Sequence, residues 1–482
     1  MSDADASTGG TLPAVDLLIR HGHILTRDDA GRIVPDGAIA VAGRRIVEVG
    51  ADAALASRYS AARTIDAAGA PVHPGLVDGH LHASFHIFRG AVPDHVSERE
   101  VFDAVERVYY DAVTDEEERL GSLLASMEMI RNGTTCFLEA GTVLAPPAVA
   151  AAAEEVGIRA VIGDARVMDR PRPERRIRRS PANLDEALAR LGGELRRNAD
   201  PDALVTGHVA ILGFGTASED LLLEGKRQAD AAGTVLNMHH AYGTADTAAD
   251  RDRYGADPLV HMAKIGLLDR NLTLGHANHL TDRECELLLE TGASVAWAPA
   301  ASMMWGHGGT IHARHAELWR RGANIALGSD SGNWSNDFDL FRQASLAVLT
   351  AREAHGDRTY LVAEDVLEMA TRGGARAAGL EDRVGSIEAG KRADLVIHTL
   401  NRPELMPATD LVRNLVYAAG SKSVRTVIVD GRVVLENGAF TRIDEARLLA
   451  QINHGSRALF ARMGVAVEAN RWPRRRGPAD RN

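Results

Sequence analysis

Hydrophobic positions in the middle of the chain fall into short β-type runs separated by stretches of helical periodicity. One such stretch carries Leu120, Leu123, Leu124, Met127 and Ile130, a spacing that lines one face of a helix. Eight repeats of this strand and helix pattern predict an α/β fold of the (β/α)8 TIM-barrel type rather than an open doubly wound sheet. The expected strands are 72–78, 134–138, 159–163, 204–212, 234–239, 272–276, 294–298 and 324–328.

Both ends of the chain have a different texture, with brief β-type runs between turns rich in Gly and Asp. The runs 17–19, 38–41 and 45–49 precede the barrel, and 393–398, 424–429 and 432–435 follow it, with Asp430-Gly431 as a hairpin turn. We expect 16–71 and 385–445 to form one small composite β-sandwich domain around a barrel at 72–384. The pattern also predicts a disordered leader at 1–15 and a C-terminal helix with a basic tail at 446–482.

The amino-acid composition limits the classes of partner that the chain is expected to bind. The 482 residues are 45% hydrophobic and 25% charged, and 55 basic against 66 acidic residues give a net charge of −11, which disfavours nucleic acid. The two cysteines, Cys136 and Cys285, form no CxxC pair, so a reducing cytoplasmic location is expected. Apolar stretches are too short for the roughly 20 residues that cross a bilayer, which leaves a small-molecule substrate and no membrane.

Polar residues that bind metals stand where several predicted strands end. His80 and His82 are two residues apart at the first strand, so both imidazoles face the same side. His239, His276 and Asp330 end the fifth, sixth and eighth strands. In a closed barrel these carboxyl ends meet at one face. We therefore predict that His80, His82, His239 and Asp330 hold one divalent metal per subunit, zinc first, with iron, cobalt or manganese as alternatives.

Such a ligand set implies hydrolytic chemistry. A metal with one position open to water can lower the pKa of that water to about 7, which makes hydroxide available at neutral pH. Asp330 is expected to take the proton of the water, and His276 to orient the hydroxide and hydrogen-bond the developing oxyanion. Asp330 and His276 are thus the predicted catalytic residues.

Several motifs resemble the amidohydrolase superfamily, over about 16–438 of the chain. They are PGLVDGHLH at 74–82, MIRNGTT at 129–135, LGHANHLTD at 274–282, LGSD at 327–330 and GSIEAGKRADL at 385–395. The chain is most similar in texture to the group with S-adenosylhomocysteine deaminase, guanine deaminase and s-triazine hydrolases such as atrazine chlorohydrolase. This resemblance implies one metal, a homo-oligomer and a substrate-site role for His279. It implies a single metal because 204–217 lacks the Lys, Glu or Cys that would bridge two.

Three departures from that group bear on the substrate. Deaminases of the group carry Glu three positions after the His of strand five, where this chain has Tyr242. Their substrate-binding His of strand four falls on Leu212, and their Asn after strand seven is replaced within 300–305. There Met303 and Trp305 either line the substrate pocket or pack as ordinary core residues. His240 and Glu139, also at strand ends, face either the cavity or the helices, and Trp334 is a candidate lid residue.

These departures favour one reaction over its alternatives. Deamination of a heterocycle requires protonation of a ring nitrogen, which is the task of the missing Glu, and a Tyr with a pKa near about 10 is a poor acid. Hydrolysis of an amide-, urea- or carbamate-like bond needs no such step. We therefore expect a hydrolase of non-peptide carbon–nitrogen bonds in a fairly hydrophobic compound, as in the phenylurea and thiocarbamate hydrolases. The alternatives are an aminohydrolase of a purine, pterin or triazine and, less favoured because every expected ligand is present, a non-catalytic scaffold.

Overall fold

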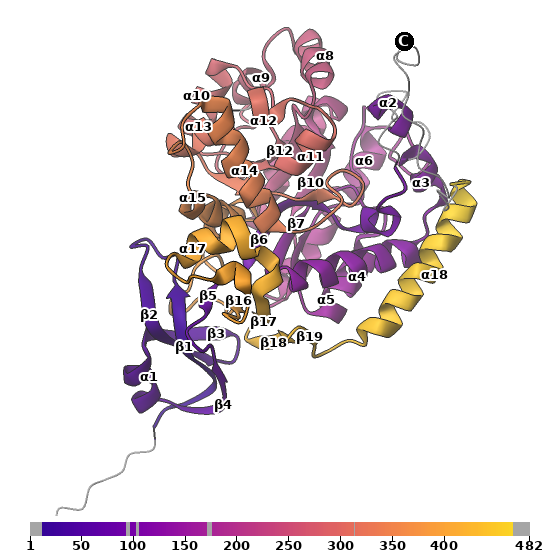
Figure 1. The fold of residues 1–482 in the computed structure, drawn as a ribbon. Helices are drawn as coiled ribbons and strands as arrows, with labels where there is room; N and C mark the ends of the chain where they lie inside the picture. The colour runs from indigo at the N-terminus through magenta and orange to yellow at the C-terminus, as the bar shows by residue number, and fades with distance from the viewer. Residues whose placement is uncertain (1–11, 93–96, 103–105, 171–175, 313, 466–482) are drawn as a thin grey trace, which may run out of the picture.

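A computed structural model of the chain describes residues 12–92, 97–102, 106–170, 176–312 and 314–465. Figure 1 shows a body of strands and helices with a mainly β region below it. Short strands and connecting turns alternate at both chain ends, whereas strands and helices alternate in between. The strands are β1 (Ala14–Leu25), β2 (Ile33–Ala42), β3 (Arg45–Ala51), β4 (Ser60–Asp66), β5 (Pro71–Pro74), β6 (Leu76–His82), β7 (Thr134–Glu139), β8 (Arg159–Ile162), β9 (Val205–Gly207), β10 (Val209–Gly213), β11 (Leu236–His240), β12 (Leu272–His276), β13 (Ser294–Trp297), β14 (Ile325–Leu327), β15 (Asp330–Ser331), β16 (Leu395–His398), β17 (Val424–Val429), β18 (Arg432–Glu436) and β19 (Ala439–Phe440).

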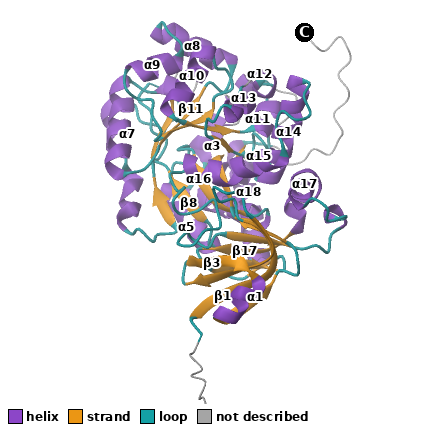
Figure 2. Cartoon of the chain, turned by 90° about the vertical axis from the view of Figure 1, so that its left-hand side faces the viewer, coloured by secondary structure: helices purple, strands orange, loops and turns teal. Residues whose placement is uncertain are grey.

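The β region joins the two ends of the chain. Among the described residues it forms a nine-stranded sheet in the order β19-β18-β17-β16-β5-β1-β2-β3, with β4 beside β1. The two ends meet where β16 pairs antiparallel with β5, and Figure 2 shows this sheet below the helix-covered strands. Hydrogen bonding runs through one continuous sheet, where the sequence predicted a sandwich. Asp430 and Gly431 take positive φ values of 52° and 76° between β17 and β18, which confirms the predicted hairpin turn.

The strands in the middle of the chain are parallel. In the described part of the chain they form two five-stranded sheets, in the orders β15-β6-β7-β8-β9 and β10-β11-β12-β13-β14. Only His208 separates β9 from β10, and only Gly328 and Ser329 separate β14 from β15. Because β15 pairs in parallel with β6, the segment that directly follows β14 returns to the first of the parallel strands. The ends of β6, β11 and β12 and the start of β15 thereby come close together.

Two predicted boundaries are wrong for identifiable reasons. The expected strand 72–78 breaks at Gly75, whose N–H donates to the carbonyl of Asp394 (2.8 Å) as the chain passes from the nine-stranded sheet into the parallel strands. A Cβ at Gly75 would lie 1.9 Å from Oγ1 of Thr135, so glycine is required at this crossing. The expected leader also ends earlier, because Ala14 and Val15 already pair with β4. Residues 1–11 and the tail at 466–482 lie outside the described residues.

Helices cover the parallel strands (Figure 2). Capping boxes begin two of them, at Thr114 with Glu117 and at Thr281 with Glu284. The helical face predicted from Leu120 to Ile130 is buried in α4 except for the half-buried Leu124. None of the helices in the described ranges is long and apolar enough to span a membrane. The α-helices are α1 (Asp52–Arg58), α2 (Glu98–Val101), α3 (Arg107–Ala112), α4 (Asp115–Arg131), α5 (Pro146–Val156), α6 (Leu184–Arg190), α7 (Glu219–Ala232), α8 (Thr244–Tyr254), α9 (Pro258–Lys264), α10 (Asp282–Thr291), α11 (Pro299–Met304), α12 (Gly309–His312), α13 (His315–Arg320), α14 (Leu340–His355), α15 (Ala363–Glu368), α16 (Gly374–Ala377), α17 (Leu411–Asn414) and α18 (Glu445–Met463).

Shorter 3-10 and π segments connect these elements. They are η1 (Ala83–Phe88), η4 (Gly193–Ala199), η5 (Phe214–Thr216), η6 (Met369–Gly373), η7 (Pro403–Leu405), η8 (Leu415–Ala419) and η9 (Gly420–Ser423). Two of them, η1 and η5, directly follow β6 and β10 and so begin the loops above the strand ends. The site described next lies on that side of the strands.

Candidate metal-binding site

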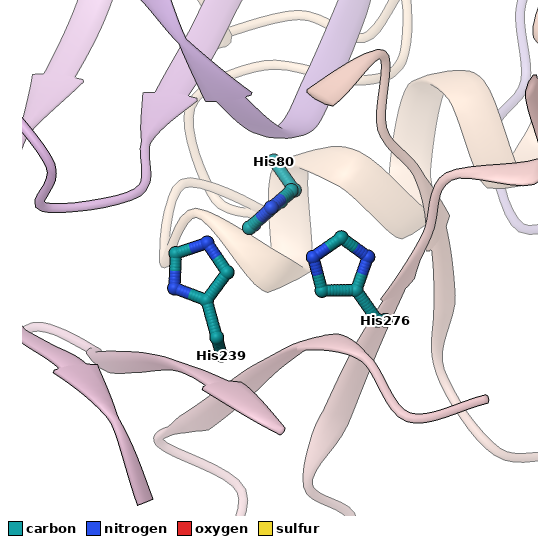
Figure 3. A group of neighbouring side chains, drawn as sticks. All are labelled: His80, His239 and His276. Atoms are coloured by element: carbon teal, nitrogen blue, oxygen red, sulfur yellow. The ribbon is translucent and has the colours of Figure 1, made fainter. Parts of the chain in front are cut away.

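Four histidines and one aspartate converge at the ends of the parallel strands. The ligand atoms of His80, His239 and His276 all lie within 4.8 Å of one another, as do those of His80, His82 and Asp330. Figure 3 shows the imidazoles of His80, His239 and His276 turned toward a common point. The structure therefore brings together the four predicted metal ligands and the predicted catalytic histidine.

Hydrogen bonds fix how two of these imidazoles face the centre. His239 donates from Nδ1 to the carbonyl of Leu212 (2.5 Å), and Nδ1 of His82 lies 2.6 Å from Oγ1 of Thr142. The Nε2 atoms of His82 and His239 are consequently directed inward and lie 3.2 Å apart. Nε2 of His82 is 3.3 Å from Oδ1 of Asp330, and Nε2 of His276 is 3.9 Å from its Oδ2. Partners that hold the far nitrogen of a histidine in this way are a usual feature of metal ligands.

His80 is the most informative member of the cluster. Its side chain is fully buried, and neither ring nitrogen has a hydrogen-bond partner among the described residues. A buried polar group without a partner costs about 1–3 kcal/mol, so such a group calls for a ligand. A divalent transition metal fits this requirement, because three or four imidazoles and one carboxylate are the donors that zinc, iron, cobalt and manganese accept.

Glycine makes room for the His80 ring. A Cβ at Gly275 on β12 would lie 2.6 Å from Cε1 and 2.7 Å from Nδ1 of His80. A Cβ at Gly328 would lie 2.9 Å from Cβ of His80. These contacts are shorter than such atoms tolerate, so glycine at 275 makes room for the imidazole of His80 and glycine at 328 makes room for its Cβ and backbone.

Burial keeps three histidines of the cluster, His80, His239 and His276, neutral. It lowers the pKa of His80 and of His239 well below the ordinary value, and it lowers the pKa of His276 to about 4. Burial by itself would raise the pKa of Asp330, but the hydrogen bond with His82 and the nearby imidazoles bring that pKa below its ordinary value. Neutral imidazoles and an ionised carboxylate are the protonation states that bind a metal.

The backbone is strained where it presents these side chains. His276 and Asp330 have φ values of 70° and 65°, and Ala241 and Ala277 have φ values of 48° and 51°. Left-handed geometry costs non-glycine residues of the order of 1–3 kcal/mol each and is concentrated at functional sites. The strain turns the chain sharply after β11 and β12, directly beside the cluster.

Asp78 forms hydrogen bonds with both the segment that carries His80 and the segment that carries Asp330. Its carboxyl accepts hydrogen bonds from the backbone N–H of His80 (3.2 Å) and of Ser329 (3.1 Å), and also from Oγ of Ser329. Burial raises the pKa of Asp78 to about 7. The residue thus links the strand of His80 to the turn that carries Asp330.

A cavity of about 150 Å³ opens beside the cluster, and its wall is mostly apolar. Leu212 and Tyr242 line it as predicted, and His240 and Trp334 also face it. His279, Met303 and Trp305 are not among its lining residues in the described part of the chain. The lining residues are His82, Phe85, Phe102, Glu106, Tyr110, Thr142, Arg166, Met168, Leu212, Gly213, Phe214, Gly215, Thr216, His239, His240, Ala241, Tyr242, Asp246, Asp250, His276, Asp330 and Trp334.

Trp305 nevertheless contributes indirectly to the wall of the cavity. Its ring packs 4.3 Å from that of Trp334, centroid to centroid, and Nε1 of Trp334 donates to Oε1 of Glu106 (3.0 Å). Trp305 therefore packs against and supports Trp334, which lines the cavity. His279 is half-buried, and Met303 is half-buried on α11.

Sequence reasoning missed four charged residues of the cavity: Arg166, Glu106, Asp246 and Asp250. Arg166 is buried, has a φ of 44° and holds its guanidinium 4.1 Å from the centre of the Tyr110 ring. None of them ends a predicted strand, because they come from loops and from α8. The one available signal was the spacing of Asp246 and Asp250, which places both on the same face of α8.

Comparison with known proteins now identifies relatives. The model of the amidohydrolase family matches residues 72–434. A 5-methylthioadenosine/S-adenosylhomocysteine deaminase of Syntrophobacter fumaroxidans is 33% identical over 451 residues, which cover 92% of this chain and 98% of that protein. A 5'-deoxyadenosine deaminase of Methanosarcina mazei is 29% identical over 453 residues, 93% of this chain and 99% of the relative.

Solved structures agree with these sequence matches. An adenosine deaminase from Xanthomonas campestris with bound zinc has a TM-score of 0.86 at 30% identity, covering 94% of this chain and 100% of the other. A mutant of atrazine chlorohydrolase from Arthrobacter aurescens, complexed with zinc and atraton, has a TM-score of 0.82 at 23% identity, covering 91% of this chain and 100% of the other. The second match concerns the fold alone.

Proposed function

Because this chain belongs to the amidohydrolase family and is a hydrolase of carbon–nitrogen bonds, we propose that it hydrolyses an amide-, urea- or carbamate-like bond in a fairly hydrophobic small molecule. The observation that carries this proposal is Tyr242. It lines the cavity beside His276, with the two ring centroids 6.1 Å apart, where the deaminases that the chain resembles keep a Glu.

We propose one divalent metal, zinc, held by His80, His82, His239 and Asp330. When bound, such an ion lowers the pKa of a water molecule and polarises a carbonyl oxygen. Asp330 accepts the proton of the attacking water and later returns it to the departing nitrogen. His276, whose Nε2 is 3.9 Å from Asp330, donates a hydrogen bond to the oxygen that becomes negative.

The chemistry of Tyr242 separates the two candidate reactions. Addition of hydroxide to a purine or triazine ring requires protonation of a ring nitrogen, which a carboxylic acid performs well. A phenol with a pKa near about 10 performs it poorly at neutral pH, although it can still donate a hydrogen bond. In an amide, urea or carbamate the negative charge forms on the carbonyl oxygen instead, and His276 is the residue beside it.

The rest of the cavity supports a hydrophobic substrate. Phe85, Met168, Leu212 and Phe214 supply apolar wall, and the volume of about 150 Å³ is of the size that accepts a benzene-sized ring. An N-aryl compound places its ring against this wall and its carbonyl carbon at the metal.

A second candidate is deamination of a purine nucleoside, because the Syntrophobacter relative that is named for this reaction aligns over 98% of its length. In that case a different carboxylate must protonate the ring. Asp246 is the best placed one, because it lines the cavity four residues after Tyr242 and acts electrostatically on His276. Exchange of Asp246 therefore discriminates the two reactions.

We also propose that the parallel strands form one closed (β/α)8 barrel. The breaks at His208 and at Gly328 to Ser329 are one and two residues long, and β15 pairs with β6, which supports a single ring of eight strands. Closure explains how ligands from β6, β11 and β15 reach the same ion.

The proposal is tested with the zinc-loaded enzyme and two panels of compounds. One panel contains anilides, aryl ureas, aryl carbamates and thiocarbamates, and the other contains adenosine, 5-methylthioadenosine, guanine, pterins and aminotriazines. We expect release of aryl amine from the first panel, with Asp246→Asn within about tenfold of wild type. Ammonia release from the second panel alone, abolished by Asp246→Asn, would establish the deaminase instead.

A further inference from the structure

Glu139 is the last residue of β7, and the sequence left open whether it faces the cavity or the helices. In the structure its side chain is fully buried and is not among the described residues that line the cavity. The carboxyl group turns back over the loop that follows β7. Oε2 accepts from the backbone N–H of Gly141 (2.8 Å), and Oε1 accepts from the N–H and from the hydroxyl of Thr142 (3.4 Å each). Glu139 therefore orients Thr142.

The same loop places the hydroxyl of Thr142 against one of the predicted metal ligands. The backbone N–H of Ala140 donates to the carbonyl of Leu81 (2.9 Å), which brings the loop to the end of β6. Oγ1 of Thr142 lies 2.6 Å from Nδ1 of His82. One hydroxyl thus lies between the imidazole of His82 and the carboxyl of Glu139.

A hydroxyl partner alone would not determine which nitrogen of His82 carries the proton. A hydroxyl can donate or accept, whereas the carbonyl of Leu212, which is the partner of His239, can only accept. If the hydroxyl donates to Nδ1, the proton of His82 is on Nε2, which is directed at the cluster and then has no lone pair for a metal. If Nδ1 donates to the hydroxyl, Nε2 keeps the lone pair that a ligand needs.

Glu139 removes this ambiguity, because its carboxyl accepts the one hydrogen of the Thr142 hydroxyl. The groups that bond to this carboxyl in the described part of the chain are all donors. Burial raises the pKa of Glu139, and these donors and the nearby His82 act in the opposite direction. With its hydrogen directed to Oε1, Oγ1 of Thr142 offers only a lone pair to Nδ1 of His82.

We propose that Glu139 and Thr142 are positioning residues that fix the tautomer of His82, with the proton on Nδ1 and the lone pair of Nε2 directed at the metal. The three groups act in series: Nδ1–H of His82 donates to Oγ1 of Thr142, and Oγ1–H donates to Oε1 of Glu139. This inference rests on the proposed function only in taking His82 as a metal ligand. It does not depend on the substrate or on which bond is broken.

Zinc affinity gives one test, measured on the metal-free protein by competition with a chromophoric chelator. Thr142→Val keeps the shape of the side chain but removes the hydroxyl, and we expect it to bind zinc about 10–100-fold more weakly than wild type. Thr142→Ser keeps the hydroxyl and should recover most of the affinity. Thr371→Val is the matched control, because it removes a buried hydroxyl that donates to the carbonyl of Leu367 outside the cluster. It should bind zinc as tightly as wild type.

The tautomer gives a second readout, which loss of packing alone would not change. Histidine labelled with a nitrogen isotope shows by NMR which ring nitrogen carries the proton, at a pH where the imidazole is neutral. The signals of His82 are identified by their loss in His82→Asn. We expect the proton on Nδ1 in metal-free wild type and in Thr142→Ser. In Thr142→Val it should move toward Nε2, because Nδ1 has lost its acceptor and Oδ1 of Asp330 lies 3.3 Å from Nε2.

Glu139→Gln tests the outer member of the series. Its amide N–H can donate to Oγ1 of Thr142, which frees the hydroxyl hydrogen for Nδ1 of His82. We therefore expect Glu139→Gln to move the proton of His82 toward Nε2 and to weaken zinc binding, although the hydroxyl is still present.

Three results would overturn the assignment. They are zinc binding by Thr142→Val as tight as by wild type, a His82 proton on Nε2 in metal-free wild type, or an unchanged tautomer in Glu139→Gln. Failure of the proposed metal site looks different, because wild type and every variant would then bind no zinc. Failure of the proposed reaction would leave the zinc affinities and the tautomers as expected here.

Discussion

His315 donates a hydrogen bond from Nε2 to the carbonyl oxygen of His276, over 2.6 Å. His315 is buried at the start of α13 and stacks on the indole of Trp297, with ring centroids 4.8 Å apart and an interplanar angle of 4°. It therefore holds the backbone of His276 in its left-handed conformation from outside the cavity. The imidazole that we propose to be catalytic is thus positioned by a residue that is not among the described lining of the cavity.

Replacement of His315 should consequently affect turnover more than binding. His315→Leu leaves the carbonyl of His276 without its donor, and a lost buried hydrogen bond of about 1–3 kcal/mol corresponds to roughly tenfold or more in kcat. KM should change by less than about threefold. Steady-state kinetics on the zinc-loaded variant measure both parameters. His315→Gln should recover part of kcat, and a change in KM alone would refute the positioning role.

Asp330 should be essential for turnover but not for folding. Asp330→Asn removes the carboxylate that accepts the proton of water, and loss of a general base costs about 10²–10⁴-fold in kcat. The amide oxygen can still contact a metal, so zinc content should remain near one ion per chain. Metal analysis together with kinetics checks both parts. Activity within tenfold of wild type would contradict the proton-transfer role.

Gly275 should be required for metal affinity. In Gly275→Ala the new Cβ would lie 2.6 Å from Cε1 of His80 and must displace that ring. We expect zinc affinity to fall by at least about tenfold, as when a group that orients a metal ligand is lost. Competition with a chromophoric chelator measures the zinc affinity. Gly193→Ala is the matched control, because its Cβ would meet only ordinary contact, 3.8 Å from Asp164. Equal affinities of the two variants would refute the crowding argument.

A buried histidine pair should make the protein sensitive to acid. Nε2 of His73 on β5 lies 2.8 Å from Nε2 of His398 on β16, and burial lowers the pKa of His73 to about 4. The unfolded chain binds a proton near the ordinary value of about 6.5, so the folded state binds fewer protons between these values. Stability from His73 is therefore fully present above pH 6.5 and is lost as the pH falls toward 4.

The size of this effect follows from the two pKa values. At pH 5 the free energy of unfolding should be about 2 kcal/mol lower, through His73, than at pH 7. Urea unfolding at both pH values measures the loss, and His73→Gln, which cannot be protonated, should show that much less pH dependence. The metal ligands also titrate, but they contribute equally to both proteins. An unchanged pH dependence in the variant would contradict the prediction.

Sequence patterns predicted the parts of this protein that depend on the periodicity of a strand or on the residues at its end. Strand periodicity located the runs that become β7 and β12, and the residues after them identified the cluster around His80, because strand ends converge in a parallel α/β fold. The break at Gly75 was missed because 72–78 was taken as one strand-like run, although its two parts join different sheets. Hydrophobicity alone does not reveal which sheet a run joins.

The cavity was predicted less completely because its walls come from loops. Tyr242 and Leu212 were found because they fall where the deaminases that the chain resembles carry substrate-site residues, whereas Arg166 and Asp246 have no periodic signal. For Met303 and Trp305 the sequence left pocket lining and ordinary packing open. Met303 lies on α11 and Trp305 directly follows it, and among the described residues Trp334, which packs on Trp305, lines the cavity instead.

The central claim is that the site of Asp330 and Tyr242 hydrolyses an amide-like bond. It is tested most directly by kcat/KM of the zinc-loaded enzyme for N-phenylurea, acetanilide and phenyl carbamates against 5-methylthioadenosine and adenosine, with Tyr242→Glu measured in parallel. We predict at least about 100-fold preference for one of the amide-like compounds in wild type and a gain of ammonia release from the nucleosides in Tyr242→Glu. Efficient deamination of the nucleosides by wild type, with none of the amide-like compounds hydrolysed, would contradict the account.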